Sequence, residues 1–438
     1  MNKKYFLLGF IGKFITTYFV LVSVFLITVI AACTIPSSLL KQNIGKTLNT
    51  LKKEGSYPSF GIPWRQIVLD NFTDTLMLNT VYSVDSKNPL KSALVNIRHD
   101  GNVDSINQIS NLEKLYFNKD IQQVGYERYW HGYLIYLRPL LAIVSYSGIR
   151  IFITLLLYSS FIFFIYLSWK KLGKIITIAF ILGLISVDFF YLGQSMQFSS
   201  VFLIGLLGGI YMILTYKNQH SLYILFFIIG ALTSFFDLLT APLITLGMLL
   251  IIATSLEKKN KISIFLYCLL WSIGYLLLWF SKWLIVQILF TPGAIVAAFN
   301  QIIDRTVNRA DANFSHLNAV KLNFFQLIGY NRVNKIIILF IFIVSSIFFI
   351  RYFAFKKEKI NKVITWILIG IIPYLWYLIA ANHSYLHVWY TYRNQFMSVV
   401  CLFLVAVEFI DWSYVRRDLK SIGKNISFYE LASKNHKN

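Results

Sequence analysis

Long apolar runs dominate the chain and alternate with short polar segments. Each run holds roughly 17–25 residues, the length that an α-helix needs to cross the hydrocarbon core of a bilayer. The ten runs lie at 14–35, 149–168, 175–192, 198–216, 221–236, 241–256, 262–283, 335–353, 363–381 and 396–412. The pattern predicts an all-α integral membrane protein with about ten transmembrane helices.

A shorter apolar stretch at 133–146 is interrupted by Pro139. Because it is too short to cross a bilayer, we expect an interfacial or re-entrant helix there. The hydrophobic pattern then divides the whole chain into six parts. They are a first transmembrane helix at 1–35, an extracytoplasmic loop domain at 36–147, a transmembrane bundle at 148–290, a second loop at 291–334, a further bundle at 335–412 and a basic tail at 413–438.

Lysine and arginine set the expected orientation, because positive residues collect in the short cytoplasmic loops of membrane proteins. They mark the N-terminus, the loops near 170, 217, 259 and 356, and the C-terminal tail, whereas the short loops on the other side hold only Arg393. We therefore expect a multi-pass protein of the plasma membrane with both termini in the cytoplasm. Both long loops would then lie outside.

The composition agrees with a membrane protein. Hydrophobic residues make up 57% of the chain and charged residues 14%, against about 25% charged residues in soluble domains. This excludes an ordinary soluble globule and a disordered chain. The net charge of +22 would suggest a nucleic-acid partner in a soluble protein. Here the cytoplasmic loops account for it, so we expect membrane lipid and no nucleic acid as a partner.

Cys33 suggests a second interpretation of the N-terminus. Lysines, an apolar stretch and the sequence at 30–33 resemble a lipoprotein signal, whose cleavage before Cys33 would remove the first helix. The apolar run is longer than the core of about 7–15 residues in a usual signal, which favours an uncleaved anchor. Cys268 and Cys401 lie in other apolar runs, so the cysteines form no disulfide framework and no metal-type spacing.

Polar side chains gather near the helix ends on the expected outer side. Such groups are expensive beside a membrane and are therefore candidates for a functional site. The residues expected to line a cavity there are His131, Asp188, Asp237, His383, His387 and Tyr390. Arg128 and Arg138, near the end of the first loop, add cations suited to a phosphate. Each of these residues also has a structural interpretation as a helix cap, an ion-pair partner or part of an aromatic belt.

Two pairs of residues have the spacing i, i+4, which places both members on one face of a helix. Asp70 and Asp74 form the first pair, and a carboxylate there could act as a general base toward a hydroxyl acceptor. The alternative is a solvated loop in which both start turns and helices. His383 and His387 form the second pair, which could hold a divalent cation. No third ligand lies within sequence reach, so the metal requirement stays open.

The motifs of nucleotide-using and hydrolytic enzymes are missing from the sequence. It has no phosphate-binding loop, no dinucleotide glycine fingerprint and no nucleophile elbow. An ATP-driven pump or a kinase is therefore disfavoured. An enzyme working on the outer face would need an activated substrate that a lipid delivers.

Four segments together form a pattern that extends over most of the chain. They are 70–74 in the first loop, 129–133 with Arg138 and Pro139, 236–242, and 382–384 with 392–394. The arrangement resembles the GT-C superfamily of membrane glycosyltransferases, and within it polytopic proteins of Gram-positive bacteria whose genes lie near those for surface polysaccharides. In that superfamily the acidic residue usually follows the first helix closely, whereas Asp70 lies well down the loop.

The resemblance implies transfer of a sugar from a polyprenyl-phosphate carrier to a glycan or envelope acceptor outside the cytoplasm. It assigns the base to Asp70 or Asp74 and the lipid phosphate to Arg128, Arg138 and Arg393. Two other functions also fit the sequence. A flippase or transporter of a lipid-linked glycan would place polar residues at the membrane midplane, where the chain has few charges. A non-catalytic scaffold of an envelope assembly complex would tolerate substitutions in the outer loops.

Overall fold

Helices form most of the structure, which is a computed structural model of residues 3–62, 65–100, 107–119, 122–216, 219–257, 264–308, 311, 313–329, 332–418 and 420. All ten predicted apolar runs are helical. They correspond to α1 (Lys3–Cys33), α7 (Tyr146–Lys171), α8 (Lys174–Ser186), α9 (Met196–Thr215), α10 (Gln219–Phe236), α11 (Leu243–Leu256), α12 (Ile264–Leu289), α15 (Arg332–Tyr352), α16 (Ile360–Ile379) and α19 (Phe396–Glu408). Of the predicted tail at 413–438, all but 413–418 and 420 lies outside the described residues.

Five helical stretches are long and apolar enough to cross a membrane. They are Ile11–Cys33, Tyr146–Lys171, Met196–Thr215, Ile264–Leu289 and Lys357–Ile379. The other predicted spans fall on helices whose described apolar stretch is shorter, such as Leu243–Leu256 and Leu339–Tyr352. The helix α8, for example, ends at Ser186, two residues before Asp188 turns the chain in a left-handed conformation. The chain is therefore an all-α membrane protein with at least five helices of spanning length.

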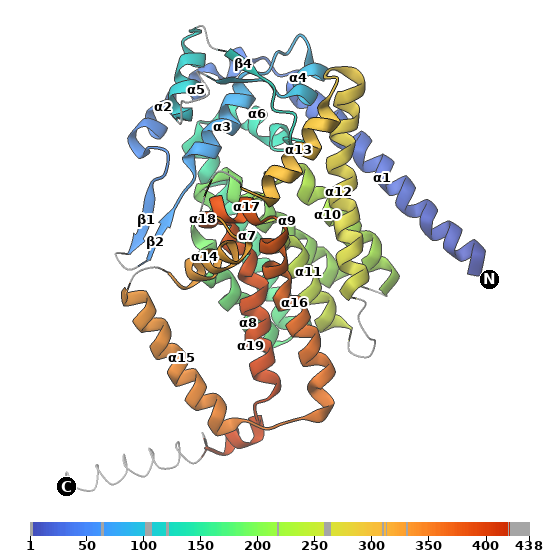
Figure 1. Ribbon diagram of the computed structural model, residues 1–438, viewed down its shortest axis with the longest axis vertical. Helices are drawn as coiled ribbons and strands as arrows, with labels where there is room; N and C mark the ends of the chain where they lie inside the picture. The colour runs from blue at the N-terminus through green and yellow to red at the C-terminus, as the bar shows by residue number, and fades with distance from the viewer. Residues whose placement is uncertain are drawn as a thin grey trace.

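The segment expected to form a loop domain, 36–147, folds into short helices and two small antiparallel sheets at one end of the bundle (Figure 1). We call this segment the loop domain. Its helices are α2 (Lys41–Glu54), α3 (Asn71–Tyr82), α4 (Pro89–Val95), α5 (Gln108–Tyr116) and α6 (Leu134–Ile143). Each sheet has two strands: β1 (Ser59–Ile62) pairs with β2 (Arg65–Val68), and β3 (Arg98–Asp100) pairs with β4 (Gln122–Val124). The expected interfacial helix is α6, which continues through Pro139.

Two buried cations hold the loop domain to the bundle. Lys282 of α12 donates to the carbonyl of Ala93 at 2.9 Å and to the side chain of Asn96 at 2.6 Å. Arg138 of α6 donates to the carbonyl oxygens of Ala32 near the end of α1, of Ile35 just after it, and of Val81 near the end of α3. Because a buried cation is costly without partners, these contacts fix the position of the domain.

The second long loop is also helical rather than irregular. It holds α13 (Ala294–Thr306) and α14 (His316–Ile328), and the last loop holds α17 (Ala381–Leu386) and α18 (Val388–Thr391). Asn323 on α14 donates to the carbonyl of Ser384 at 2.8 Å and accepts from the hydroxyl of Thr391 at 2.7 Å. These bonds join α14 to both short helices of the last loop, at the same end of the bundle as the loop domain.

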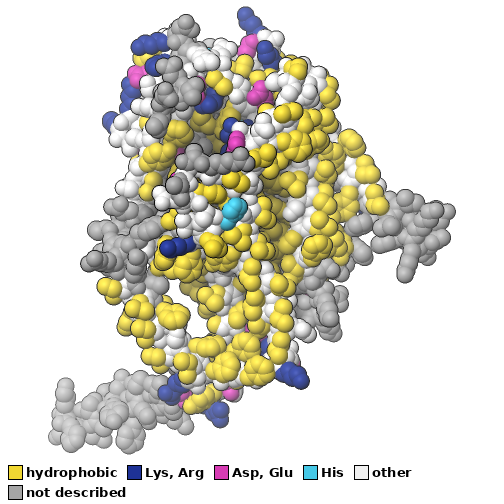
Figure 2. All heavy atoms as spheres, in the orientation of Figure 1, with side chains coloured by type: hydrophobic (Ala, Val, Ile, Leu, Met, Phe, Trp, Pro, Cys, Tyr) yellow, Lys and Arg dark blue, Asp and Glu magenta, His cyan; other side chains and the backbone are white. Residues whose placement is uncertain are grey.

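Side-chain types are distributed as a membrane protein requires. Figure 2 shows hydrophobic side chains over the bundle, while Lys and Arg gather mainly at the two ends of the molecule. In the same orientation, α15 stands beside the bundle, and α1 extends away from it toward the N-terminus (Figure 1).

The predicted orientation can be tested with two exposed acidic residues, Asp85 of the loop domain and Glu358 at the opposite end. We expect a membrane-impermeant maleimide to label Asp85→Cys in intact cells, because the loop domain should face outward. Glu358→Cys should react only after the cells are permeabilised. The unsubstituted protein gives the background of the native cysteines, and labelling of Glu358→Cys in intact cells would show the inverse orientation.

Candidate functional site

Three of the six residues expected to line a cavity, His383, His387 and Tyr390, lie together in the segment formed by α17 and α18. The ring of Tyr390 stacks on that of His387, with centroids 5.1 Å apart, and lies 5.9 Å from the ring of His383. Burial raises the pKa of Tyr390 far above its usual range, and the carboxylate of Asp70 adds to this rise while Arg305 opposes it. We call the following residues the Tyr390 cluster: Asp70, Tyr129, Arg305, His383, His387, Trp389, Tyr390 and Arg393.

Asp70 caps the first turn of α3, but it is buried and not part of the solvated loop that the alternative interpretation proposed. Its carboxylate accepts from the backbone N–H of Thr73 at 2.9 Å and from the Thr73 hydroxyl at 3.0 Å. The indole nitrogen of Trp389 lies 3.5 Å from the same carboxylate, which is 1% exposed. Burial raises the pKa of Asp70 to about 6, although the bonds from Thr73 oppose the rise. Asp70 is therefore both the N-cap of α3 and a carboxyl group whose pKa lies close to neutral pH.

Asp74, one turn further along α3, has a different environment. Its carboxylate accepts four hydrogen bonds: from the Tyr146 hydroxyl at 2.5 Å, from the backbone N–H groups of Met196 at 2.9 Å and Gln197 at 3.0 Å, and from the Ser195 hydroxyl at 3.3 Å. Asp74 thus satisfies the free N–H groups at the start of α9, where an anion is favoured. Burial raises its pKa, and the bonds from Tyr146 and α9 oppose the rise.

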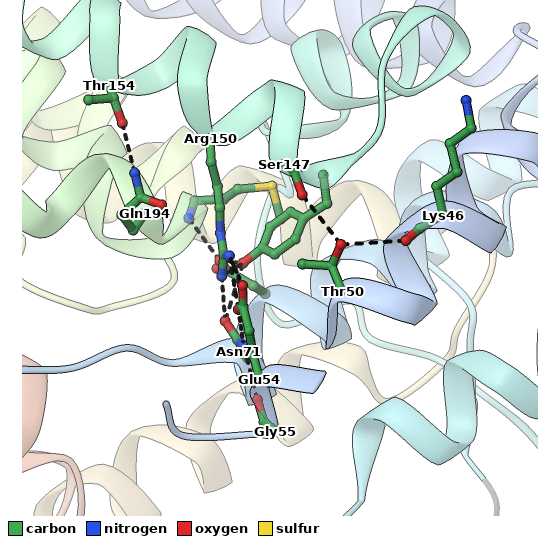
Figure 3. A network of polar contacts seen from close by, with 12 residues as sticks. Lys46, Thr50, Glu54, Gly55, Asn71, Ser147, Arg150, Thr154 and Gln194 are labelled. Carbon is green, nitrogen blue, oxygen red and sulfur yellow. Dashed lines mark hydrogen bonds and ion pairs between the residues drawn. The ribbon is translucent and has the colours of Figure 1, made fainter. Parts of the chain in front are cut away.

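A polar network continues from Arg150 to Glu54 and Asn71 of the loop domain (Figure 3). Arg150 of α7 donates to the Tyr146 hydroxyl at 2.9 Å, to the Asn71 side chain at 2.8 Å and to both carboxylate oxygens of Glu54 at 2.7 and 2.9 Å. Although burial acts to raise it, the bonds from Arg150 and Asn71 lower the pKa of Glu54 below its usual value. Together with Asp74 this network fixes α3 against α7 and α9, and so determines where Asp70 lies.

Two arginines supply positive charge to the Tyr390 cluster. Arg305 of α13 donates to Nδ1 of His383 at 2.6 Å and to the hydroxyl of Tyr129 at 3.1 Å. Arg393 donates to the Trp389 carbonyl at 3.0 Å, and its guanidinium carbon lies 4.3 Å from the centre of the Phe198 ring. Within the described part of the chain, neither arginine has a carboxylate at ion-pair distance, and the buried Nε of Arg393 has no hydrogen-bond partner.

The two histidines lie together, with ring centroids 4.8 Å apart. Nε2 of His383 faces the carbonyl of Leu239 at 2.7 Å and must donate to it, so Nδ1 holds the lone pair that accepts from Arg305. Burial lowers the pKa of His383 well below its usual value, and that of His387 to about 4, with the charge of Arg305 adding to both. Both rings are therefore neutral at physiological pH.

The possibility of a divalent cation at the two histidines, which the sequence left open, has little support from this geometry. The only lone pair on His383 is engaged by Arg305, so His383 and His387 cannot both ligate an ion. Among the described residues, no group of three His, Cys, Asp or Glu side chains could hold a metal.

The other predicted cavity residues position the cluster rather than project into it. Asp237 accepts from the backbone N–H of Thr240 at 3.0 Å, and burial raises its pKa to about 6. Between them, Leu239 has a φ of 67°, a rare conformation for leucine, and its carbonyl is the group that His383 contacts. Asp188 accepts from the hydroxyl of Tyr392 at 2.6 Å, next to Arg393.

His131 lies two residues after Tyr129 in the same segment. Its ring contacts the Tyr133 hydroxyl at 2.8 Å and the Tyr126 carbonyl at 2.7 Å. Burial lowers the pKa of His131 to about 3, so it is also neutral. Arg128 lies at the edge of the cluster, with its guanidinium carbon 5.6 Å from the centre of the Tyr126 ring.

Arg138 does not join the other arginines. Its Nε donates to the Ala32 carbonyl at 2.9 Å, and its two terminal nitrogens donate to the carbonyls of Val81 and Ile35. The side chain is fully buried. Because the side chain is fully buried and each of its nitrogens already bonds a backbone carbonyl, we leave Arg138 out of the proposed phosphate site.

Sequence reasoning left Arg305, Tyr129 and Phe198 out of the candidate site. In the sequence, Arg305 is one of several charged residues in the second long loop. Only the packing of α13 against α17 shows that it contacts His383. Phe198 is one of many aromatic residues in an apolar run, so no local signal separates it from the core. Tyr129 belongs to an aromatic segment that an interfacial belt explains equally well.

Comparison with known proteins adds no further assignment. No protein-family model, no curated protein and no solved structure matches the chain. The resemblance to the GT-C superfamily therefore stays a prediction, and the site is interpreted from its own geometry.

The two aspartates of α3 should respond to the same substitution in opposite ways. Asp74→Asn places an amide nitrogen against the N–H groups of α9 and should lower the free energy of unfolding by about 1–3 kcal/mol. Asp70→Asn should raise it. A pKa raised from 3.8 to about 6 means that stability is lost as pH rises through this window, an effect worth about 3 kcal/mol at most.

Thermal unfolding in detergent tests this contrast. Well above the pKa of Asp70, Asp70→Asn should melt higher than the parent protein and Asp74→Asn lower. The advantage of Asp70→Asn should shrink as pH falls toward 4, because the parent carboxyl is then protonated. Equal shifts of the two variants in the same direction would show that Asp70 and Asp74 do not differ as described.

Proposed function

We propose that the protein is a polytopic membrane glycosyltransferase of GT-C type, with about ten membrane crossings and both termini in the cytoplasm. It would use a polyprenyl-phosphate-linked sugar at the outer leaflet of the plasma membrane, in the synthesis of a surface polysaccharide or another envelope glycan. The Tyr390 cluster would be its active site.

One observation carries the proposal. A nearly fully buried carboxylate, Asp70, with a pKa of about 6, shares a cluster with arginines that have no carboxylate partner in the described residues. A general base works best when its pKa lies near the working pH. Uncompensated arginines beside it favour an anionic ligand, and guanidinium groups match a phosphate geometrically. A base next to a phosphate site is what transfer from a sugar phosphate to a hydroxyl requires.

These positions support the following reaction. Asp70 takes the proton of the acceptor hydroxyl as its oxygen forms a bond to the anomeric carbon of the sugar. The bond between that carbon and the phosphate oxygen breaks, and the polyprenyl phosphate leaves with the electron pair. Arg393 and Arg305 stabilise the charge that develops on this phosphate.

The aromatic side chains around the carboxylate suit the sugar. Trp389 and Tyr390 lie beside each other, with ring centroids 5.5 Å apart, and Tyr57 lies 5.9 Å from Trp389. Such rings offer flat apolar faces with a polar edge. Neutral His387 adds a further ring, whose buried Nδ1 has no hydrogen-bond partner among the described residues. These groups would hold the transferred sugar between Asp70 and the arginines.

Replacement of the base gives the first functional test. Asp70→Asn keeps an oxygen for the cap but removes the base, so turnover of a polyprenyl-phosphate sugar by purified protein should fall by about 100- to 10,000-fold. Turnover by the parent protein should rise as pH passes about 6. Asp85→Asn, an exposed residue of the same domain, is the matched control and should keep full activity.

Two outcomes would count against this assignment. Unchanged turnover by Asp70→Asn would remove Asp70 from the role of base. Movement of a lipid-linked glycan across vesicle membranes without any turnover would favour a transporter over the enzyme.

Replacement of the arginines tests the phosphate site. A charge-assisted hydrogen bond contributes about 1.5–3 kcal/mol, so Arg393→Gln and Arg305→Gln should each lower kcat/KM for the lipid-linked sugar by about 10- to 100-fold. Lys321→Gln, on the exposed side of α14, removes one positive charge outside the cluster and should have little effect. Equal losses for all three variants would indicate attraction by overall charge rather than a defined phosphate site.

A further inference from the structure

The helix α13 has two faces of different character. Its protein side presents Ala294 and Ala298, which are buried and belong to one packed cluster with Trp283 and Val286 of α12. Arg305 continues this side at helical spacing and reaches His383. The helix is therefore held firmly along one side, from its first turn to its last.

The opposite side carries an exposed apolar stripe. Val296, Phe299 and Ile303 recur at the spacing of one helix face and are 64%, 58% and 56% exposed. Asn300 and Asp304, each one position further along the helix, are also exposed and form a polar edge beside the stripe. A helix divided in this way suits a boundary between apolar and aqueous surroundings.

The place of α13 in the fold identifies the apolar surroundings. It follows α12, a helix of spanning length whose last turn still exposes Ile288 and Leu289. Gly293, with a φ of 91°, reverses the chain between the two helices. In Figure 1, α13 runs from the end of α12 toward α17. In this view its axis is not parallel to the axis of α1. The apolar stripe is thus continuous in sequence with a surface that faces lipid.

We propose that α13 lies in the headgroup boundary of the membrane, with Val296, Phe299 and Ile303 among the acyl chains of the leaflet next to the loop domain. An interfacial helix buries its apolar face there while its polar edge stays in water. The bilayer surface is then a binding partner of the site, because it holds the helix whose other side delivers Arg305 to His383 and Tyr129. This inference does not depend on the reaction that the site performs.

Spin labels on matched pairs of residues test the proposal. The native cysteines Cys33, Cys268 and Cys401 are replaced by alanine, and single labels are placed at Phe299→Cys or Asn300→Cys. The protein is reconstituted into vesicles of palmitoyl-oleoyl phosphatidylglycerol. Collision with oxygen reports the lipid phase, and collision with a water-soluble nickel chelate reports the aqueous phase. Ile303→Cys and Asp304→Cys form a second pair, should a substitution at Phe299 disturb folding.

The expected result is a several-fold higher ratio of oxygen to nickel accessibility at 299 than at 300, and likewise at 303 than at 304. Equal nickel accessibility within both pairs would place the stripe in water and overturn the proposal. A label at 299 shielded from both reagents would also overturn it, and would indicate that a second copy of the chain or another protein covers the stripe. Neither readout requires enzymatic activity, so failure here is distinct from failure of the proposed function.

Discussion

The buried carboxylate of Asp74 is the contact on which the candidate site depends. It accepts hydrogen bonds from the start of α9 and from Tyr146, so one side chain of the loop domain completes a helix of the bundle. Arg150 extends the same contact to Glu54 and Asn71. Because α3 is rigid over a single turn, fixing Asp74 also fixes Asp70. A functional role for Asp70 thus rests on a structural role for its neighbour.

In the Tyr390 cluster the arginines are charged, while the histidines beside them are neutral. The histidines are neutral because they are buried beside Arg305, so the positive charge of the cluster lies on the arginines. Leu239, in an unfavourable backbone conformation, offers its carbonyl to His383. Strain of this kind persists only where surrounding contacts impose it, and here Asp237 and His383 supply them. The arrangement keeps Arg305 at the site without an acidic partner among the described residues.

Sequence reasoning succeeded best where a pattern had a single physical cause. Apolar runs of spanning length gave ten helices, and the pairs Asp70 with Asp74 and His383 with His387 do lie together in space. It was weaker where one residue type serves two purposes. Arg138 and Arg393 look alike in sequence, but the first bonds three backbone carbonyls while the second keeps a free Nε. Arg305 had no distinguishing signal, because its partner lies 78 positions away.

By itself, the sequence determined that the chain is a helical membrane protein, and it predicted that the candidate site residues lie near one end of the helices. Hydrophobic transfer free energy acts on each run separately, so no knowledge of neighbours is needed. Only the tertiary structure decided which carboxylate caps α9 and which remains in the cluster, and which arginines have no acidic partner among the described residues. Burial and hydrogen bonding set these properties, and both depend on segments far apart in the chain.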